Sequence, residues 1–343
     1  MAALEIEFVD GGVRLPRLGL WLDPHRAQRG PWRVFVSHAH SDHIAAHREV
    51  ILTDATARLM RARIRGQRVE HLLSLREPRE FAGPEGSFRV TLLPAGHILG
   101  SAMALIEADN ESLLYTGDFK LRPGLAAQVC TPHAADVLVM ETTFGRPAYR
   151  FPPAETVQRD IIEFCRETLT DGATPVLLAY SLGKSQEVLA ALADTGLAVA
   201  LHDAVWKMTK IHEACGCRFP VHERLGPDTP PGRVLICPPP MAQPASWAAV
   251  GRTRTAIVSG WAVEPGCRFR YGVDAAFPLS DHADYPDLLA FVGQVGPRRV
   301  FTLHGFAADF AATLRERGID ARALSEAEQL TLALGLPPAT AEG

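Results

Sequence analysis

The residues best suited to chemistry lie in the segment Ser37–His43, which holds three histidines and one aspartate in the pattern H-x-H-x-D-H. The apolar run Val34–Val36 before it predicts a buried strand, so the polar residues are expected on the loop that follows this strand. Imidazole and carboxylate groups together suit a divalent ion such as zinc. Two neighbouring ions need about seven or eight ligand atoms. One loop cannot supply that many, so other parts of the chain are expected to contribute ligands.

Three more candidate ligands stand where other apolar runs end. His97 lies between two glycines, which let a backbone bend closely around an ion. Asp118 follows a second run, and a carboxylate can bridge two ions. His304 follows the last run of the chain. Each of these residues alone is better explained by a structural role. Only their combination with the Ser37–His43 loop predicts a site for two ions.

The overall composition indicates an ordinary globular protein. The chain has 343 residues, of which 47% are hydrophobic and 22% are charged. This is enough for a large core and one or two domains. There are 35 lysines and arginines against 39 acidic residues, which gives a formal net charge of −4. Because there is no global basic excess, a nucleic acid would have to be held by a local groove.

We find no sign of a signal peptide, a membrane span or a C-x-x-C metal motif in the sequence. The first residues lack the basic start and apolar core of a signal peptide, and no apolar stretch approaches the length of a membrane span. The six cysteines include no C-x-x-C pair, although Cys215 and Cys217 form a C-x-C. Free thiols in a reducing compartment are the simplest interpretation. We therefore expect a cytoplasmic protein with no membrane partner.

Short apolar runs alternate with amphipathic stretches along the chain, which is typical of an α/β fold. Several runs stop shortly before a polar residue of interest, and strand ends carry the functional side chains in open α/β sheets. These residues are Asp23, His38, Asp118, Glu141 and His304. The predicted strands are Gly19–Leu22, Val34–Val36, Val90–Leu93, Leu113–Tyr115, Val137–Met140, Val176–Ala179, Val234–Ile236, Ala256–Val258 and Val300–Leu303.

Four motifs occur in an order that resembles the metallo-β-lactamase family. They are H-x-H-x-D-H, G-H-x-L-G at residues 96–100, T-G-D-F at residues 116–119 and the late His304. Asp23 resembles an earlier motif of the family, an aspartate that supports the metal loop from behind. The resemblance implies an αββα sandwich of two sheets flanked by helices. It also implies two ions, one held by His38, His40, His97 and Asp118 and the other by Asp42, His43, Asp118 and His304.

Further motifs resemble the β-CASP nuclease branch of this family. They are Glu141 in E-T-T-F-G, His282 in S-D-H-A-D, and again His304. This branch has an α/β cap domain inserted into the sandwich. The implied division is a first metallo-β-lactamase part at residues 1–143, a β-CASP cap at 144–272 and a second metallo-β-lactamase part at 273–343.

Residues 176–187 resemble the segment of the cap that lies near the nucleic-acid backbone in this branch. A predicted strand leads into a glycine and then a helix, whose free amides and dipole favour an anion. An ordinary helix start is the alternative interpretation. The expected phosphate-binding residues are Ser181, Gly183 and Lys184, and further cations near the end of the cap are Arg252, Arg254, Arg268 and Arg270.

The resemblance implies a two-metal phosphodiesterase. The expected cofactors are two divalent ions, zinc or else manganese, about 3.5–4 Å apart, and a hydroxide between them is expected to attack phosphorus. His282 is the expected general acid for the leaving oxygen. Glu141 is expected to orient His282 and raise its pKa, and Asp42 completes the catalytic candidates. His47 is interpreted as structural, and His25 matches no motif.

The stretch at residues 275–289 most resembles the bacterial ligase-associated DNA exonucleases. This favours DNA over RNA, an exonuclease of DNA repair, and association with a DNA ligase or helicase. His304, however, is typical of RNA-directed members at its position, so a β-CASP ribonuclease of RNA processing is the main alternative. A small-molecule metallo-hydrolase would not need a cap with Glu141 and His282. A non-catalytic nucleic-acid scaffold would lack metal ligands, and none is missing here.

Overall fold

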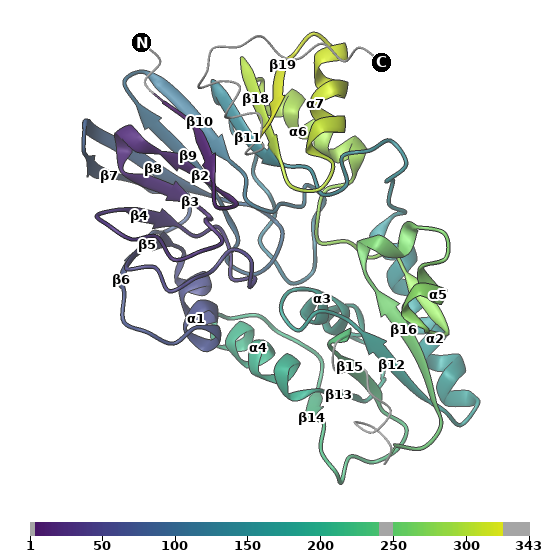
Figure 1. Cartoon of the computed structure of the whole chain (residues 1–343). Coiled ribbons are helices and arrows are strands. Elements are labelled where there is room, and N and C mark those ends of the chain that lie inside the picture. Colours follow the sequence, from purple (N-terminus) through teal and green to yellow (C-terminus); the bar gives the residue numbers. More distant parts are fainter. Residues whose placement is uncertain (1–3, 240–249, 325–343) are drawn as a thin grey trace.

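The computed structural model describes residues 4–239 and 250–324 and contains three β-sheets (Figure 1). Two sheets pack face to face with helices on their outer faces, and the third sheet belongs to a second α/β body beside them. The expected αββα sandwich with an inserted α/β domain is therefore confirmed. Each strand predicted from the sequence overlaps a strand of the structure.

The first sheet of the sandwich has six strands in sequential order. They are β1 (Glu7–Val9), β2 (Gly12–Leu15), β3 (Leu20–Leu22), β4 (Arg33–Phe35), β5 (Glu49–Leu52) and β6 (Val69–Leu72), with a 3-10 turn at Pro16–Leu18. β3 and β4 are parallel neighbours, with Leu22 paired to Phe35. Asp23 and the loop Ser37–His43 therefore leave the sheet at the same edge.

The second sheet has seven strands in the order β19-β18-β11-β10-β9-β8-β7. They are β7 (Pro78–Gly83), β8 (Gly86–Pro94), β9 (Ala102–Ala108), β10 (Glu111–Tyr115), β11 (Val137–Glu141), β18 (Arg299–Leu303) and β19 (Asp320–Ala323). β8, β10, β11 and β18 all run in the same direction. His97, Asp118, Glu141 and His304 stand at or just after the ends of these strands, so residues far apart in the sequence meet at one edge.

Apolar side chains fill the space between the two sheets. Phe35 of the first sheet and Tyr115 of the second contact each other edge to face, with ring centroids 6.1 Å apart. Helix α1 (Asp54–Arg63) covers the outer face of the first sheet. Helices α6 (Tyr285–Val295) and α7 (Ala307–Glu316) cover the outer face of the second. The strand ends are thereby held in a fixed frame.

The third sheet is wholly parallel, in the order β14-β13-β15-β12-β16-β17. Its strands are β12 (Thr174–Leu178), β13 (Val199–Leu201), β14 (His222–Arg224), β15 (Val234–Cys237), β16 (Thr253–Val258) and β17 (Ala275–Phe277). Helices α2 (Ala154–Thr170), α3 (Lys184–Ala191) and α4 (Asp203–Ala214) pack on one face, and α5 (Cys267–Tyr271) packs on the other, after a 3-10 turn at Gly260–Val263. We call this body the cap. Its last strand, β17, lies beyond residue 272.

An apolar cluster joins the cap to the sandwich close to the histidine-rich loop. Ala39, Leu59 and Ile98 of the sandwich pack there against Leu182 and Met208 of the cap. Leu182 belongs to the loop between β12 and α3, so this loop rests directly on the segments that carry the expected metal ligands. None of the helices in the described ranges has the length and apolar character needed to cross a lipid bilayer.

Candidate metal centre and active site

Asp23 lies behind the histidine-rich loop. Its carboxylate accepts hydrogen bonds from the backbone N–H of Ser37 (2.7 Å) and from the hydroxyl of Tyr115 (3.1 Å). The carboxylate also lies 3.0 Å from Nδ1 of His43. Because this contact occupies Nδ1, the other ring nitrogen of His43 is left to face Asp118, at 3.5 Å.

Four of the expected ligands meet in one cluster. Nε2 of His38 and Nε2 of His97 each lie 3.0 Å from Nδ1 of His40. The same two atoms lie 3.5 and 3.7 Å from Oδ2 of Asp118. Ligand atoms around a tetrahedral zinc ion with ~2.0–2.1 Å bonds lie about 3.3 Å apart. Three converging imidazole nitrogens and one carboxylate oxygen at these distances fit the coordination shell of one such ion.

The protonation states of this cluster suit a cation. Burial lowers the pKa of His38 well below its ordinary value, lowers the pKa of His40, and lowers the pKa of His97 to about 3. Burial raises the pKa of Asp118, but the neighbouring histidines, His43 foremost and then His282 and His38, together outweigh burial and hold this pKa well below its ordinary value. Neutral imidazoles and an ionised carboxylate are the forms that bind metals.

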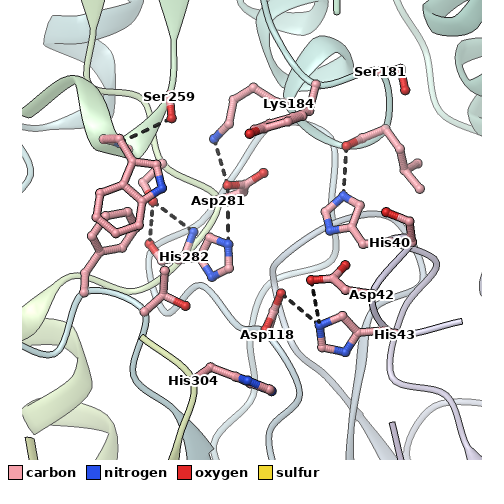
Figure 2. Close-up of a pocket in the computed structure, with 18 of the residues that line it drawn as sticks. His40, Asp42, His43, Asp118, Ser181, Lys184, Ser259, Asp281, His282 and His304 are labelled. Carbon is pink, nitrogen blue, oxygen red and sulfur yellow. Dashed lines mark hydrogen bonds and ion pairs between the residues drawn. The ribbon is translucent and has the colours of Figure 1, made fainter. Parts of the chain in front are cut away.

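The second expected ligand set is more open. Nε2 of His43 lies 3.5 Å from Oδ2 of Asp118 and 3.9 Å from Oδ2 of Asp42, whose side chain is 66% exposed. The ring of His304 is farther away, with its centroid 6.1 Å from that of His43, and it stacks on the exposed ring of His25 at 5.9 Å. Figure 2 shows Asp118 at the centre, with His43 and Asp42 on one side and His282 on the other.

Glu141 and His282 form a pair next to the first cluster. Oε1 of the fully buried Glu141 lies 2.8 Å from Nδ1 of His282. The backbone N–H groups of Phe119 and Thr143 also donate to this carboxylate, which holds it in place. Burial lowers the pKa of His282, but Glu141, with smaller contributions from Asp118 and Asp281, outweighs burial and raises this pKa to about 9. The ring of His282 lies 4.6 Å from that of His97, at the edge of the metal cluster.

Two of the three expected phosphate-binding residues already have partners within the protein. The backbone N–H of Gly183 donates to a glutamine side chain of its own helix. Nζ of Lys184 donates to the carbonyl of Leu279 (2.7 Å) and pairs with Asp281 (3.0 Å), and the lysine side chain is only 2% exposed. Ser181 differs, because its hydroxyl has no hydrogen-bond partner in the described ranges. The Gly183 N–H and the Lys184 ammonium are thus already used within the protein, because a buried helix start must satisfy its own polar groups.

A cavity of about 590 Å³ opens onto the metal cluster from between the sandwich and the cap, and Figure 2 draws it in close-up. The sandwich side includes His40, Asp42 and Asp118, and the cap side includes Ser181 and Lys184. None of the four expected arginines, Arg252, Arg254, Arg268 and Arg270, is among the described residues that line it. Those arginines are therefore not placed to contact a substrate inside the cavity.

Several residues of this region were not assigned to the site from the sequence. Arg63, at the end of α1, lines the cavity, and its guanidinium makes no ion pair or hydrogen bond within residues 4–239 and 250–324. Tyr180 and His25 line it as well. Asp281 pairs with Lys184. Asp281 stands inside the S-D-H-A-D motif and Tyr180 inside the stretch of residues 176–187, whereas Arg63 and His25 belong to no motif.

Known proteins share features with this chain. Residues 275–324 match a family described as "Zn-dependent metallo-hydrolase RNA specificity domain". A protein of Opitutus terrae named "Probable DNA ligase" is 51% identical over 329 residues, which are 95% of this chain and 32% of that protein. An "RNase J-like protein" of Methanocaldococcus jannaschii is 30% identical over 218 residues, which are 55% of this chain and 50% of that protein.

The chain thus spans between about a third and half of the length of these two relatives. Among solved structures, a protein of unknown function from Enterococcus faecalis has the same fold, with a TM-score of 0.54 at 15% identity. That similarity covers 88% of this chain and 81% of the other.

Proposed function

The chain belongs to the metallo-β-lactamase/β-CASP family, and on this premise we propose that it is a metal-dependent nuclease that hydrolyses phosphodiester bonds of DNA. One observation carries the proposal above all others. The Glu141–His282 pair stands beside a buried cluster of metal-type ligands, in one cavity with it. Such an arrangement combines an electrophilic centre with a separate proton donor, which hydrolysis of a phosphodiester requires.

The proposed cofactors are two divalent ions, zinc or else manganese. His38, His40, His97 and Asp118 would hold the first. Asp42, His43, Asp118 and His304 would hold the second. Ions bound there would lower the pKa of a water molecule and neutralise charge on the phosphate.

In the proposed reaction, His282 donates the proton that the leaving oxygen needs. Because Glu141 lies at Nδ1 and fixes the ring, Nε2 is the atom that faces the cavity and would hand a proton to the leaving oxygen. Asp23 has a complementary role: its contact with Nδ1 of His43 fixes the orientation of that ring. Both roles depend on buried carboxylates that a substrate does not touch.

Arg63 and Ser181 are the proposed contacts to the phosphate backbone. Among the residues that the structure describes, Arg63 makes no ion pair and the Ser181 hydroxyl makes no hydrogen bond, so they can bring a charge from the sandwich side and a hydroxyl from the cap side. Lys184 would act indirectly, because its ammonium is buried against Asp281. Phosphate contacts of this kind position a strand without reading its sequence.

The relatives' names support different substrates. The Opitutus relative is named for a DNA ligase, which supports a DNA-repair exonuclease that works with a ligase or helicase system. The archaeal relative is named for a ribonuclease, and the matching family is described by RNA specificity. These two observations favour the second candidate, a ribonuclease of RNA processing. We also propose that the protein is cytoplasmic and that its chain divides at residues 143/144 and, because β17 (Ala275–Phe277) pairs with β16 in the cap sheet, after residue 277 rather than at 272/273.

End-labelled single- and double-stranded DNA and RNA of one sequence will test the proposal, with metal-free protein and with added zinc or manganese. We expect metal-dependent shortening of DNA from an end, and no cleavage by the Asp118→Ala variant prepared in parallel. Faster cleavage of RNA than of DNA would establish the second candidate. If metal-loaded protein leaves both nucleic acids intact but hydrolyses small esters or lactams, the nuclease proposal is wrong.

A further inference from the structure

The cap supplies a carbonyl group to one of the metal-type histidines. Nε2 of His40 lies 3.1 Å from the backbone oxygen of Leu182, in the loop between β12 and α3 (Figure 2). A carbonyl oxygen only accepts hydrogen bonds, so Nε2 of His40 must carry the proton. The lone pair is then on Nδ1, which is the atom that faces His38 and His97 at 3.0 Å. The cap thus selects the form of His40 that can bind an ion in this cluster.

His97 is fixed in the same way by a segment that follows the cap in the chain. Its Nδ1 lies 2.7 Å from the backbone oxygen of Asp281, and its Nε2 faces the cluster. Two of the three imidazoles of the first set therefore depend on carbonyl groups from outside the first 143 residues. His38 differs, because its Nδ1 contacts the hydroxyl of the adjacent Ser37 at 2.9 Å.

A buried ion pair ties the two carbonyl-bearing segments together. Nζ of Lys184 lies 3.0 Å from Oδ1 of Asp281 and donates to the carbonyl of Leu279 at 2.7 Å. The lysine is two residues from Leu182, so the pair fixes the spacing between the carbonyl behind His40 and the carbonyl behind His97. A buried ion pair contributes little net stability after desolvation. Its effect here is on geometry.

We propose that the Ser181–Lys184 loop and the Lys184–Asp281 pair are positioning elements of the first metal site, so that its metal affinity depends on how the cap is docked. The inference rests on the metal-binding part of the proposed function. Groups that orient metal-binding histidines typically change affinity ~10–100-fold when they are lost. A displaced cap loop is expected to have an effect of that size.

Gly183 offers a way to displace the loop. It has φ +85°, and a Cβ atom placed there would lie 2.2 Å from Cγ2 of Ile98, so a side chain forces the loop away from the sandwich. Gly172 is the matched control. It is also a cap glycine with positive φ (+67°), but a Cβ atom there meets nothing within 4 Å. Both substitutions strain the backbone, and only Gly183→Ala pushes on the segment behind His40.

The experiment is a competition between metal-free full-length protein and a chromophoric chelator for zinc, with thermal unfolding of each variant as a check on folding. Gly183→Ala should weaken the tightest zinc site roughly 10–100-fold. Gly172→Ala should change it less than about twofold. Removing the Ile98 branch in Ile98→Ala/Gly183→Ala should restore part of the affinity lost in Gly183→Ala, so the Gly183→Ala substitution should cost less in the Ile98→Ala background than in wild type. A folded Gly183→Ala protein with wild-type zinc affinity would overturn the proposal.

A second variant keeps the test decisive if Gly183→Ala does not fold. Lys184→Met/Asp281→Asn removes the ion pair without changing the net charge near the site, and it leaves the Asp281 carbonyl in the chain. We expect its tightest zinc affinity to fall about tenfold. Unchanged affinity in this variant also contradicts the proposal. If wild-type protein itself takes up no zinc or manganese, the proposed function fails. If wild type and variants bind zinc with equal affinity, only the inference about the cap loop is wrong.

Discussion

The two expected metal sets differ in how much of their geometry the protein fixes by itself. In the first set, His38, His40 and His97 each have a hydroxyl or carbonyl oxygen within 3.1 Å of the ring nitrogen that faces away from the cluster. In the second set, the Asp42 side chain is 66% exposed, and the ring of His304 contacts exposed His25. Preorganised ligands bind an ion at a smaller cost in side-chain entropy. We therefore expect the first set to bind its ion more tightly.

Asp118 is the one residue that both sets share, so its loss should abolish the difference between them. We expect Asp118→Ala to lose bound metal and to lower the rate of cleavage by roughly 10⁴-fold or more, as for residues that work as a unit. Elemental analysis and a cleavage assay on the same preparation will measure both. A wild-type protein that saturates at a single ion would contradict the sharing of Asp118.

His282 lies beside the first set without being needed to complete it, so its loss should leave the comparison intact. We expect His282→Gln to keep its metal content and to lose ~10²–10⁴-fold in rate, the range of general acid catalysis. Glu141→Gln should act in the same direction, because an amide cannot stabilise a charged imidazole as a carboxylate does. Loss of metal together with activity would show that His282 is itself a ligand.

Ligand substitutions in each set should sharpen the comparison. We expect His40→Gln to remove the tightest zinc site, a larger effect than the ~10–100-fold cost of losing a supporting group. His304→Gln should leave that tightest site intact and weaken only the second ion. Zinc titration against a chelator of matched affinity will separate the two. Equal losses at the tightest site in both variants would mean that the sets are not independent.

Arg63 lines the cavity on the sandwich side, and its substitution is expected to have the smallest effect of those proposed here. If it contacts one phosphate, Arg63→Ala should weaken single-strand binding for all sequences and lower the slope of log affinity against log salt by about one unit. Arg58 is the control on the same helix, because it already pairs with Asp54. An unchanged slope in Arg63→Ala, measured with metal-free protein, would remove this contact.

Local pattern determined much of the fold and of the metal cluster. The strands that carry Asp23, His38, Asp118, Glu141 and His304 are short apolar runs bounded by polar residues, and such runs are readable without knowledge of their partners. The strands that were not predicted include β9 (Ala102–Ala108), where alanine, a weak strand former, interrupts the apolar run. Such strands form because they pair with neighbouring strands, and their own residues do not predict them.

Only the tertiary structure decided what the cap does at the site. The same stretch that predicted a phosphate cradle turned out to bury Lys184 against Asp281 and to present the Leu182 carbonyl to His40, which lies 142 residues earlier. Arg63 likewise faces the cavity only because α1 packs beside the cap. A motif shows which residue types are available. Whether a lysine binds a phosphate or an aspartate depends on which partner the folded chain places within about 3 Å of it, and sequence spacing does not contain that distance.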